Sequence, residues 1–186
     1  MNILTLPKMV VSSREGWSEV EKAHPSMAKL FAYLVLPLSV LPPVMLYFAG
    51  KHYGDDFIAG FGSRHLELIS TVFFLAELAT FGAMGWFIKQ IAKYNTVDIS
   101  DHDAYMLAGI APVPLWLSSL GLLVPSVMFN AGVSLAALAM SCGLIYHGVY
   151  ALCHMHDEVS AMAITQAVIG AGMVGWAILL VIIVPL

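Results

Sequence analysis

The sequence predicts an all-α integral membrane protein, built as a bundle of five transmembrane helices. The first observation is composition: hydrophobic residues make up 60% of the 186 residues, and charged residues only 11%, against about 25% charged residues in a typical soluble domain. The second is that the apolar residues are gathered into long uninterrupted segments. This composition excludes a disordered chain, a nucleic-acid-binding protein and an ordinary cytosolic enzyme.

Five apolar segments are each long enough to cross the membrane, because a hydrocarbon core of about 30 Å needs about 20 helical residues. The expected spans cover residues 28–50, 66–91, 104–124, 126–153 and 161–186. The connections between them are too short to hold a soluble domain. The chain therefore divides into an N-terminal segment, residues 1–27, and a membrane domain, residues 28–186.

The N-terminal segment carries the signals of a short helix. Residues 12–15 read Ser-Ser-Arg-Glu, which matches the S-x-x-E capping box that begins many helices. Trp17 follows, and Pro25 should end the helix near residue 23. Tryptophan is typical of lipid headgroup regions, so we expect a helix lying at the membrane interface. The alternative is a solvated amphipathic turn.

The distribution of basic residues predicts the orientation of the chain. With five spans and an internal N-terminus, six of the eight Lys and Arg residues lie on the cytoplasmic side and two lie outside. The six are Lys8, Arg14, Lys22, Lys29, Lys89 and Lys93, and the two are Lys51 and Arg64. The positive-inside rule therefore favours a cytoplasmic N-terminus and an external C-terminus.

Prolines interrupt the first and third spans. The expected helix breaks are Pro37, Pro42, Pro43, Pro112, Pro114 and Pro125. A proline inside a helix removes one backbone hydrogen bond and frees a carbonyl upstream, and such groups need a partner within the membrane. The breaks indicate either kinked, closely packed helices or a broken helix lining a pathway.

Small and polar residues form a stripe on the fourth span. Its members are Asn130, Ser134, Ala137, Ser141 and Gly148. Small side chains on one helix face let two helices approach closely. We expect this stripe to be a packing face, with Asn130 and Ser141 able to hydrogen-bond across it.

Glu77 is the only acidic residue expected deep within a span. Because a charged carboxylate is costly there, Glu77 should face the protein interior and be paired or protonated. Ser70 and Thr80 share its helix face, and Glu67 lies nearer the outer boundary. These four residues form a candidate intramembrane site for a proton or cation. The alternative is a protonated glutamic acid bonded to a carbonyl freed by one of the prolines.

Two polar loops on the expected cytoplasmic side offer imidazole and carboxylate groups. Such groups are plausible ligands for zinc or another divalent ion, and the candidates are His102, His154, His156 and Asp157. The alternative is a hydrated loop in which Asp101 or Asp103 caps the third span. No other cofactor is expected.

The sequence lacks the motifs of the common enzyme classes. It contains no GxSxG, HExxH, P-loop or GxGxxG pattern, so we expect a protein that is not an enzyme. The expected partners are the lipid bilayer and either a second copy of the chain or another membrane protein.

The third span resembles a known family. Residues 108–120 read Ala-Gly-Ile-Ala-Pro-Val-Pro-Leu-Trp-Leu-Ser-Ser-Leu and resemble the Yip-type integral membrane proteins. The Tyr146 and Tyr150 pair, the acidic Asp157-Glu158 and the last span follow in the family's order. The resemblance implies a five-span bundle of the Yip type and, for bacterial members, an inner-membrane protein of poorly defined biochemical role.

Two functions remain from these observations. The first is a non-enzymatic factor that organises the membrane or binds lipid or partner proteins. The second is a small proton or cation channel or transporter that uses Glu77 beside a proline-broken helix.

Overall fold

The structure, a computed structural model, describes residues 9–10, 16–23, 25–57, 59–153 and 158–183. Within these ranges the regular structure is helical and there is no strand. Five helical segments of the described chain are long and apolar enough to cross a membrane: Met27–Phe57, Leu66–Tyr94, Asp101–Leu123, Val127–Leu152 and Glu158–Val181. The expectation of an all-α chain with five spans is confirmed. The first span runs further than expected, so Lys51 lies in a helix and not in a loop.

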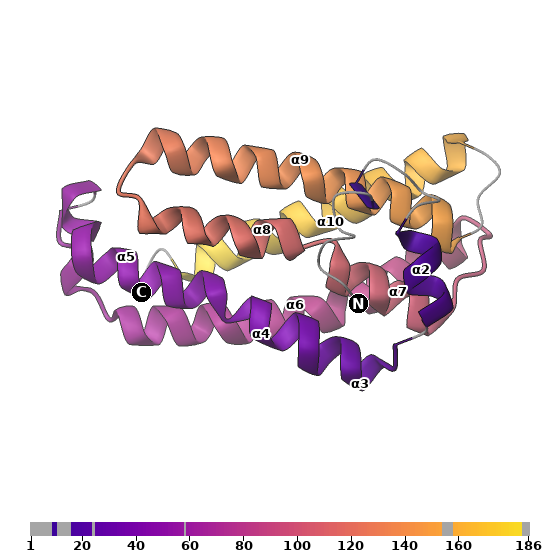
Figure 1. Cartoon of the computed structure of the whole chain (residues 1–186), viewed down its shortest axis with the longest axis horizontal. Helices are drawn as coiled ribbons and strands as arrows, with labels where there is room; N and C mark the ends of the chain where they lie inside the picture. The colour runs from indigo at the N-terminus through magenta and orange to yellow at the C-terminus, as the bar shows by residue number, and fades with distance from the viewer. Residues whose placement is uncertain (1–8, 11–15, 24, 58, 154–157, 184–186) are drawn as a thin grey trace.

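The spans lie side by side as an elongated bundle (Figure 1). Three of them contain long unbroken helices: α6 (Leu66–Tyr94), α9 (Val127–Leu152) and α10 (Glu158–Ile183), with α10 packed against both others. One end of the bundle holds the N-terminal helix α2 (Trp17–Ala23) and the α6–α7 connection. The opposite end holds the end of α5 and the connection into α9.

The first span is divided into segments. It consists of α3 (Met27–Leu30), the π-helix η2 (Phe31–Val35), α4 (Leu36–Ser39) and α5 (Leu41–Phe57). Pro37 lies in the first turn of α4, and Pro42 and Pro43 lie in the first turn of α5. The backbone N–H groups of a first turn have no partner within the helix, so proline is tolerated at these positions.

The third span is divided in the same manner. It consists of α7 (Asp101–Ile110), α8 (Val113–Ser118) and the 3₁₀-helix η4 (Ser119–Leu123). Pro112 is the residue before α8, Pro114 is in its first turn, and Pro125 precedes α9. A boundary between two helical segments thus lies near each predicted break. A bend of the helix axis at these prolines stays a prediction.

The N-terminal helix α2 is anchored by Trp17. The side chain of Trp17 is fully buried, and its indole N–H donates to the carbonyl of Met9 at 3.1 Å. The ring lies against Gly148 of α9, where an added Cβ would come within 2.7 Å of the Trp17 ring atoms Cη2 and Cζ2. The ring of Trp17 is therefore packed inside the protein, where Gly148 leaves space for it. The capping box at residues 12–15 lies outside the described residues, and the interfacial position of the helix stays a prediction.

The stripe on α9 is a packing face along most of its length. Ala137, Ser141 and Gly148 are buried, whereas Ser134 is exposed. The expected hydrogen bonds across the face are not present: Asn130 donates to the carbonyls of Val124 and Ser126, just before its own helix and at its N-cap, each at 2.9 Å. Ser141 Oγ is buried without a hydrogen-bond partner.

Helices α6 and α7 make close contact at Gly85. An added Cβ at Gly85 would lie only 2.6 Å from Cγ of Tyr105, on α7. The Tyr105 ring meets the Phe81 ring edge to face, with the ring centroids 5.8 Å apart. The connection between the two helices is held by Lys89, which donates to the Ile99 carbonyl.

Candidate functional site

Glu77 lies near the middle of α6, and its side chain is turned toward the interior. Carboxyl atom Oε2 is buried without a hydrogen-bond partner. The indole N–H of Trp116, a buried residue of α8, is placed to donate to the same carboxyl group. The alternative was a protonated Glu77 that donates to a backbone carbonyl left without a partner by a proline. No such hydrogen bond is seen at Oε2.

The other residues predicted around Glu77 lie at different levels of α6. Ser70 Oγ is buried without a partner, about 10 Å along the helix from Glu77 at 1.5 Å per residue. Glu67 is exposed in the first turn of α6, where its charge suits the helix N-terminus. Thr80 is exposed, with its methyl group near Gly175 of α10. Among the described residues, Trp116 is placed to contact the Glu77 carboxyl group.

Trp116 was not among the predicted site residues. No signal in the sequence singles out Trp116 as a partner of Glu77. Sequence spacing within α6 cannot reveal a partner from another span.

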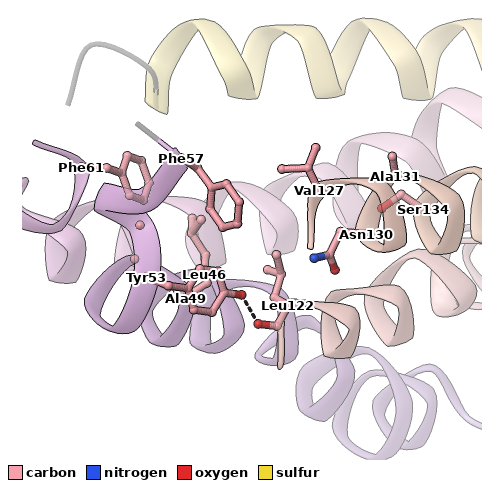
Figure 2. Close-up of a pocket in the computed structure, with 12 residues that line it drawn as sticks. Leu46, Ala49, Tyr53, Phe57, Phe61, Leu122, Val127, Asn130, Ala131 and Ser134 are labelled. Atoms are coloured by element: carbon pink, nitrogen blue, oxygen red, sulfur yellow. Dashed lines mark hydrogen bonds between the residues drawn. The ribbon is translucent and has the colours of Figure 1, made fainter. Parts of the chain in front are cut away.

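A second candidate site is an apolar groove between α5, η4 and α9 (Figure 2). Its volume is about 360 Å³. We call it the lateral groove, and it is lined by Leu46, Ala49, Gly50, Tyr53, Gly54, Phe57, Phe61, Leu122, Val127, Asn130, Ala131 and Ser134. Sequence reasoning missed it, because its walls come from three separate parts of the chain.

Two polar side chains of the lateral groove are already bonded to backbone carbonyls. The Tyr53 hydroxyl donates to the Leu122 carbonyl (Figure 2), which ties α5 to η4. The side-chain nitrogen of Asn130 donates to the carbonyls of Val124 and Ser126. The groove therefore presents mainly hydrocarbon to whatever occupies it.

The candidate metal ligand His102 has a structural role. Its Nε2 lies 2.8 Å from the carbonyl oxygen of Pro25. A carbonyl oxygen only accepts hydrogen bonds, so Nε2 carries a proton and cannot bind a metal in this arrangement. Nδ1 of His102 lies 3.4 Å from a carboxyl oxygen of Asp103. The interaction with Pro25 joins the N-terminal segment to α7.

The remaining candidate ligands, His154, His156 and Asp157, lie outside the described residues. Among the residues that the structure describes, no group of three or more His, Cys, Asp or Glu residues is arranged to hold a metal ion. The cap of α7 is Ser100, whose hydroxyl accepts from the Asp103 N–H at 3.0 Å. Neither Asp101 nor Asp103 is that cap, and both lie in the first turn of the helix.

Cys153 lies at the same end of the molecule, just after α9. The residue is buried, and burial raises the pKa of its thiol to about 11, with a smaller contribution from the charge of Asp103. Cys142 is also a free thiol.

The fold and these sites define a multi-pass α-helical membrane protein with the acidic side chain of Glu77 turned into the bundle and an apolar groove on its side. The Yip1 domain family matches residues 3–179, and the chain belongs to that family. No curated protein and no solved structure matches the chain.

Proposed function

We propose that this member of the Yip1 domain family is a non-enzymatic membrane factor that binds lipid or membrane-protein partners inside the bilayer. The observation that carries the proposal is the lateral groove. It lies between three membrane-spanning segments and is lined mainly by apolar side chains. A groove with such a lining offers binding surface, but no set of groups for acid–base or nucleophilic chemistry.

We place the protein in a bacterial inner membrane, with a cytoplasmic N-terminus and an external C-terminus. The positions of the basic residues support this orientation. Lys22 and Lys29 lie at the end of the bundle that holds α2, as do the last turns of α6 with Lys93. Arg64 lies at the opposite end.

Purification of the full chain from its native membrane in a mild detergent tests the proposal. Native mass spectrometry should show the protein with a bound lipid or partner protein at a fixed ratio. A bare monomer under conditions that preserve other lipid–protein complexes would contradict it.

A second function is favoured by one observation, the buried and unpartnered Oε2 of Glu77. In a channel or transporter, this oxygen would take up a proton or cation during transport. Replacing Glu77→Gln should then abolish proton or cation flux in proteoliposomes while the protein still folds. Glu67→Gln is the matched control, since it removes a carboxylate from the end of the same helix. Unchanged flux in Glu77→Gln, or no flux in the wild type, would rule out this function.

Metal binding through His154 and His156 stays a separate prediction. Metal analysis of the purified protein should find a bound divalent ion that is lost on replacing both histidines. Absence of a bound ion from the wild-type protein would contradict the prediction.

A further inference from the structure

We infer that a charged pocket at the end of the bundle opposite α2 binds the zwitterionic headgroup of phosphatidylethanolamine. We call it the headgroup pocket. Its volume is about 280 Å³, and it is lined by Lys51, Arg64, His65, Leu66, Glu67 and Leu68. It shares no lining residue with the lateral groove, so it is a separate site. The inference rests on the proposed function in one respect, because it names a lipid that the protein binds.

The headgroup pocket lies where the hydrocarbon core of the membrane ends. Residues 30–50 of the first span contain no charged residue, and as a helix they are about 31 Å long at 1.5 Å per residue. This length matches a hydrocarbon core of about 30 Å. Lys51 is the next residue of α5, and Glu67 lies in the first turn of α6. The charged side chains of the pocket are therefore at the depth of the lipid headgroups.

Opposite charges face this pocket from two helices without meeting each other. Close packing fixes the two helices, because Leu66 is buried and an added Cβ at Gly50 would lie 2.8 Å from its Cδ1 atom. Lys51 on α5 and Glu67 on α6 both line the pocket. Neither forms an ion pair with the other or with another described residue. The space between them therefore suits a ligand that carries both a negative and a positive group.

The two cations of the headgroup pocket are positioned by aromatic rings. The ammonium nitrogen of Lys51 lies 6.0 Å from the centre of the Tyr47 ring. The guanidinium carbon of Arg64 lies 5.9 Å from the centre of the Phe61 ring. A cation–π contact orients a cation and leaves its charge in place. Lysine and arginine are the residues that bind phosphate groups in proteins, so we assign the phosphate of the headgroup to this side of the pocket.

The charge balance favours a zwitterionic lipid over an anionic one. Residues 51–67 carry two basic and three acidic side chains, which are Lys51, Arg64, Asp55, Asp56 and Glu67. This end of the bundle therefore has no excess of positive charge to attract an anion. A phosphate without a positive group would also lie near the Glu67 carboxylate, which repels it. An ammonium group on the same ligand removes this repulsion by binding Glu67.

Glu67 should also distinguish between two zwitterionic lipids. The primary ammonium of ethanolamine has three N–H donors, as the ammonium of lysine has, and can donate to the carboxylate. The quaternary ammonium of choline has no N–H, and proteins bind it in cages of aromatic rings. The described residues that line the headgroup pocket include no Phe, Tyr or Trp. We therefore expect phosphatidylethanolamine to bind more tightly than phosphatidylcholine.

The test uses the full-length protein in nanodiscs that contain equal amounts of phosphatidylethanolamine, phosphatidylcholine and phosphatidylglycerol with identical acyl chains. The protein is released into a mild detergent, and native mass spectrometry counts the lipids that stay bound. Because the acyl chains are identical, any preference is due to the headgroup. A parallel sample contains inorganic phosphate as a competitor, which distinguishes a lipid headgroup from free phosphate as the ligand.

Two pairs of matched variants test the two sides of the pocket. Lys51→Gln removes a cation from the pocket, and Lys29→Gln makes the same change at the other end of the bundle. Glu67→Gln removes the carboxylate of the pocket, and Asp56→Asn removes a carboxylate of α5 that does not line it. All four residues are exposed, so all four variants should fold. A thermal unfolding scan of each checks this.

We expect the wild-type protein to retain about fivefold more phosphatidylethanolamine than phosphatidylcholine, which is the factor that one exposed ion pair can supply. Lys51→Gln should lower the retained phosphatidylethanolamine about fivefold. Glu67→Gln should remove the preference for phosphatidylethanolamine over phosphatidylcholine. Lys29→Gln and Asp56→Asn should behave as the wild type does, and inorganic phosphate should not displace the lipid.

Equal retention of the three lipids, or a preference for phosphatidylglycerol, would overturn the inference. A preference that survives Glu67→Gln, or an equal loss in Lys51→Gln and Lys29→Gln, would overturn it as well. Displacement of the lipid by inorganic phosphate would identify a site for free phosphate, which also contradicts the inference. In each of these cases the proposed function would still stand if native mass spectrometry showed another lipid or a partner protein bound to the Lys51→Gln variant.

Discussion

Gly85→Ala should destabilise the protein, because Gly85 packs closely against Tyr105 of α7. The new methyl group would overlap the Tyr105 ring, including Cγ at 2.6 Å, so the whole ring has to move. Overpacking a tight contact costs about 1–3 kcal/mol. Alanine returns about 1 kcal/mol through its higher helix propensity. The net loss in the free energy of unfolding should be up to about 2 kcal/mol.

Gly82→Ala on the same helix is the control. An added Cβ at Gly82 meets nothing within 4 Å, so only the propensity gain of up to about 1 kcal/mol applies. The two substitutions are chemically identical and three residues apart, yet their effects should have opposite signs.

Thermal unfolding in detergent, followed by circular dichroism, measures the difference. For a chain of this length, 1 kcal/mol corresponds to about 2–4 °C in Tm. Gly85→Ala should therefore lower Tm by up to about 8 °C, and Gly82→Ala should not lower it. In a Tyr105→Ala background the penalty of Gly85→Ala should disappear. Equal effects of the two glycine substitutions, or a penalty that persists without the Tyr105 ring, would refute the reasoning.

Two further predictions concern the α2 end of the bundle. Lys89→Met should destabilise the protein more than Asp101→Asn in the same unfolding assay. Lys89→Met removes the hydrogen bond from Lys89 to the Ile99 carbonyl, whereas Asp101→Asn removes only the 3.7 Å ion pair between Lys89 and the exposed Asp101, which is worth at most about 1 kcal/mol. Equal losses in the two variants would contradict this. In a Cys142→Ala background, Cys153 should react slowly with maleimide. Burial raises the pKa of its thiol from 9.0 to about 11, and this lowers the thiolate fraction about 100-fold near neutral pH. The rate should rise about tenfold per pH unit up to about pH 10, and a rate that levels off near pH 9 would be inconsistent with a raised pKa.

The five spans could be predicted because the bilayer imposes one simple requirement, about 20 apolar residues per crossing. The segmentation near Pro37 and Pro112 was also predictable, because proline lacks the backbone donor on which a continuous helix depends. These features depend on local sequence alone, so composition and spacing are sufficient to find them.

The partners of individual side chains could not be predicted in the same way. The burial of Trp17 depends on the absence of a side chain at Gly148, and the contact of Trp116 with Glu77 depends on the register between two spans. The lateral groove is a further example, since α5 and α9 border it but neither contains it. Each of these features is a product of packing between distant segments, which leaves no periodic pattern in the sequence.

The contact between Trp17 and Gly148 also has a consequence for the order of assembly. The two residues are separated by 131 positions in the chain, counted from their residue numbers, and the contact is part of the buried core. During synthesis the N-terminus emerges first, but its binding surface on α9 exists only once the fourth span has been made. The N-terminal helix can therefore dock only after most of the chain has been made. In a chain truncated after the third span, Trp17 would lack the α9 surface against which it is buried.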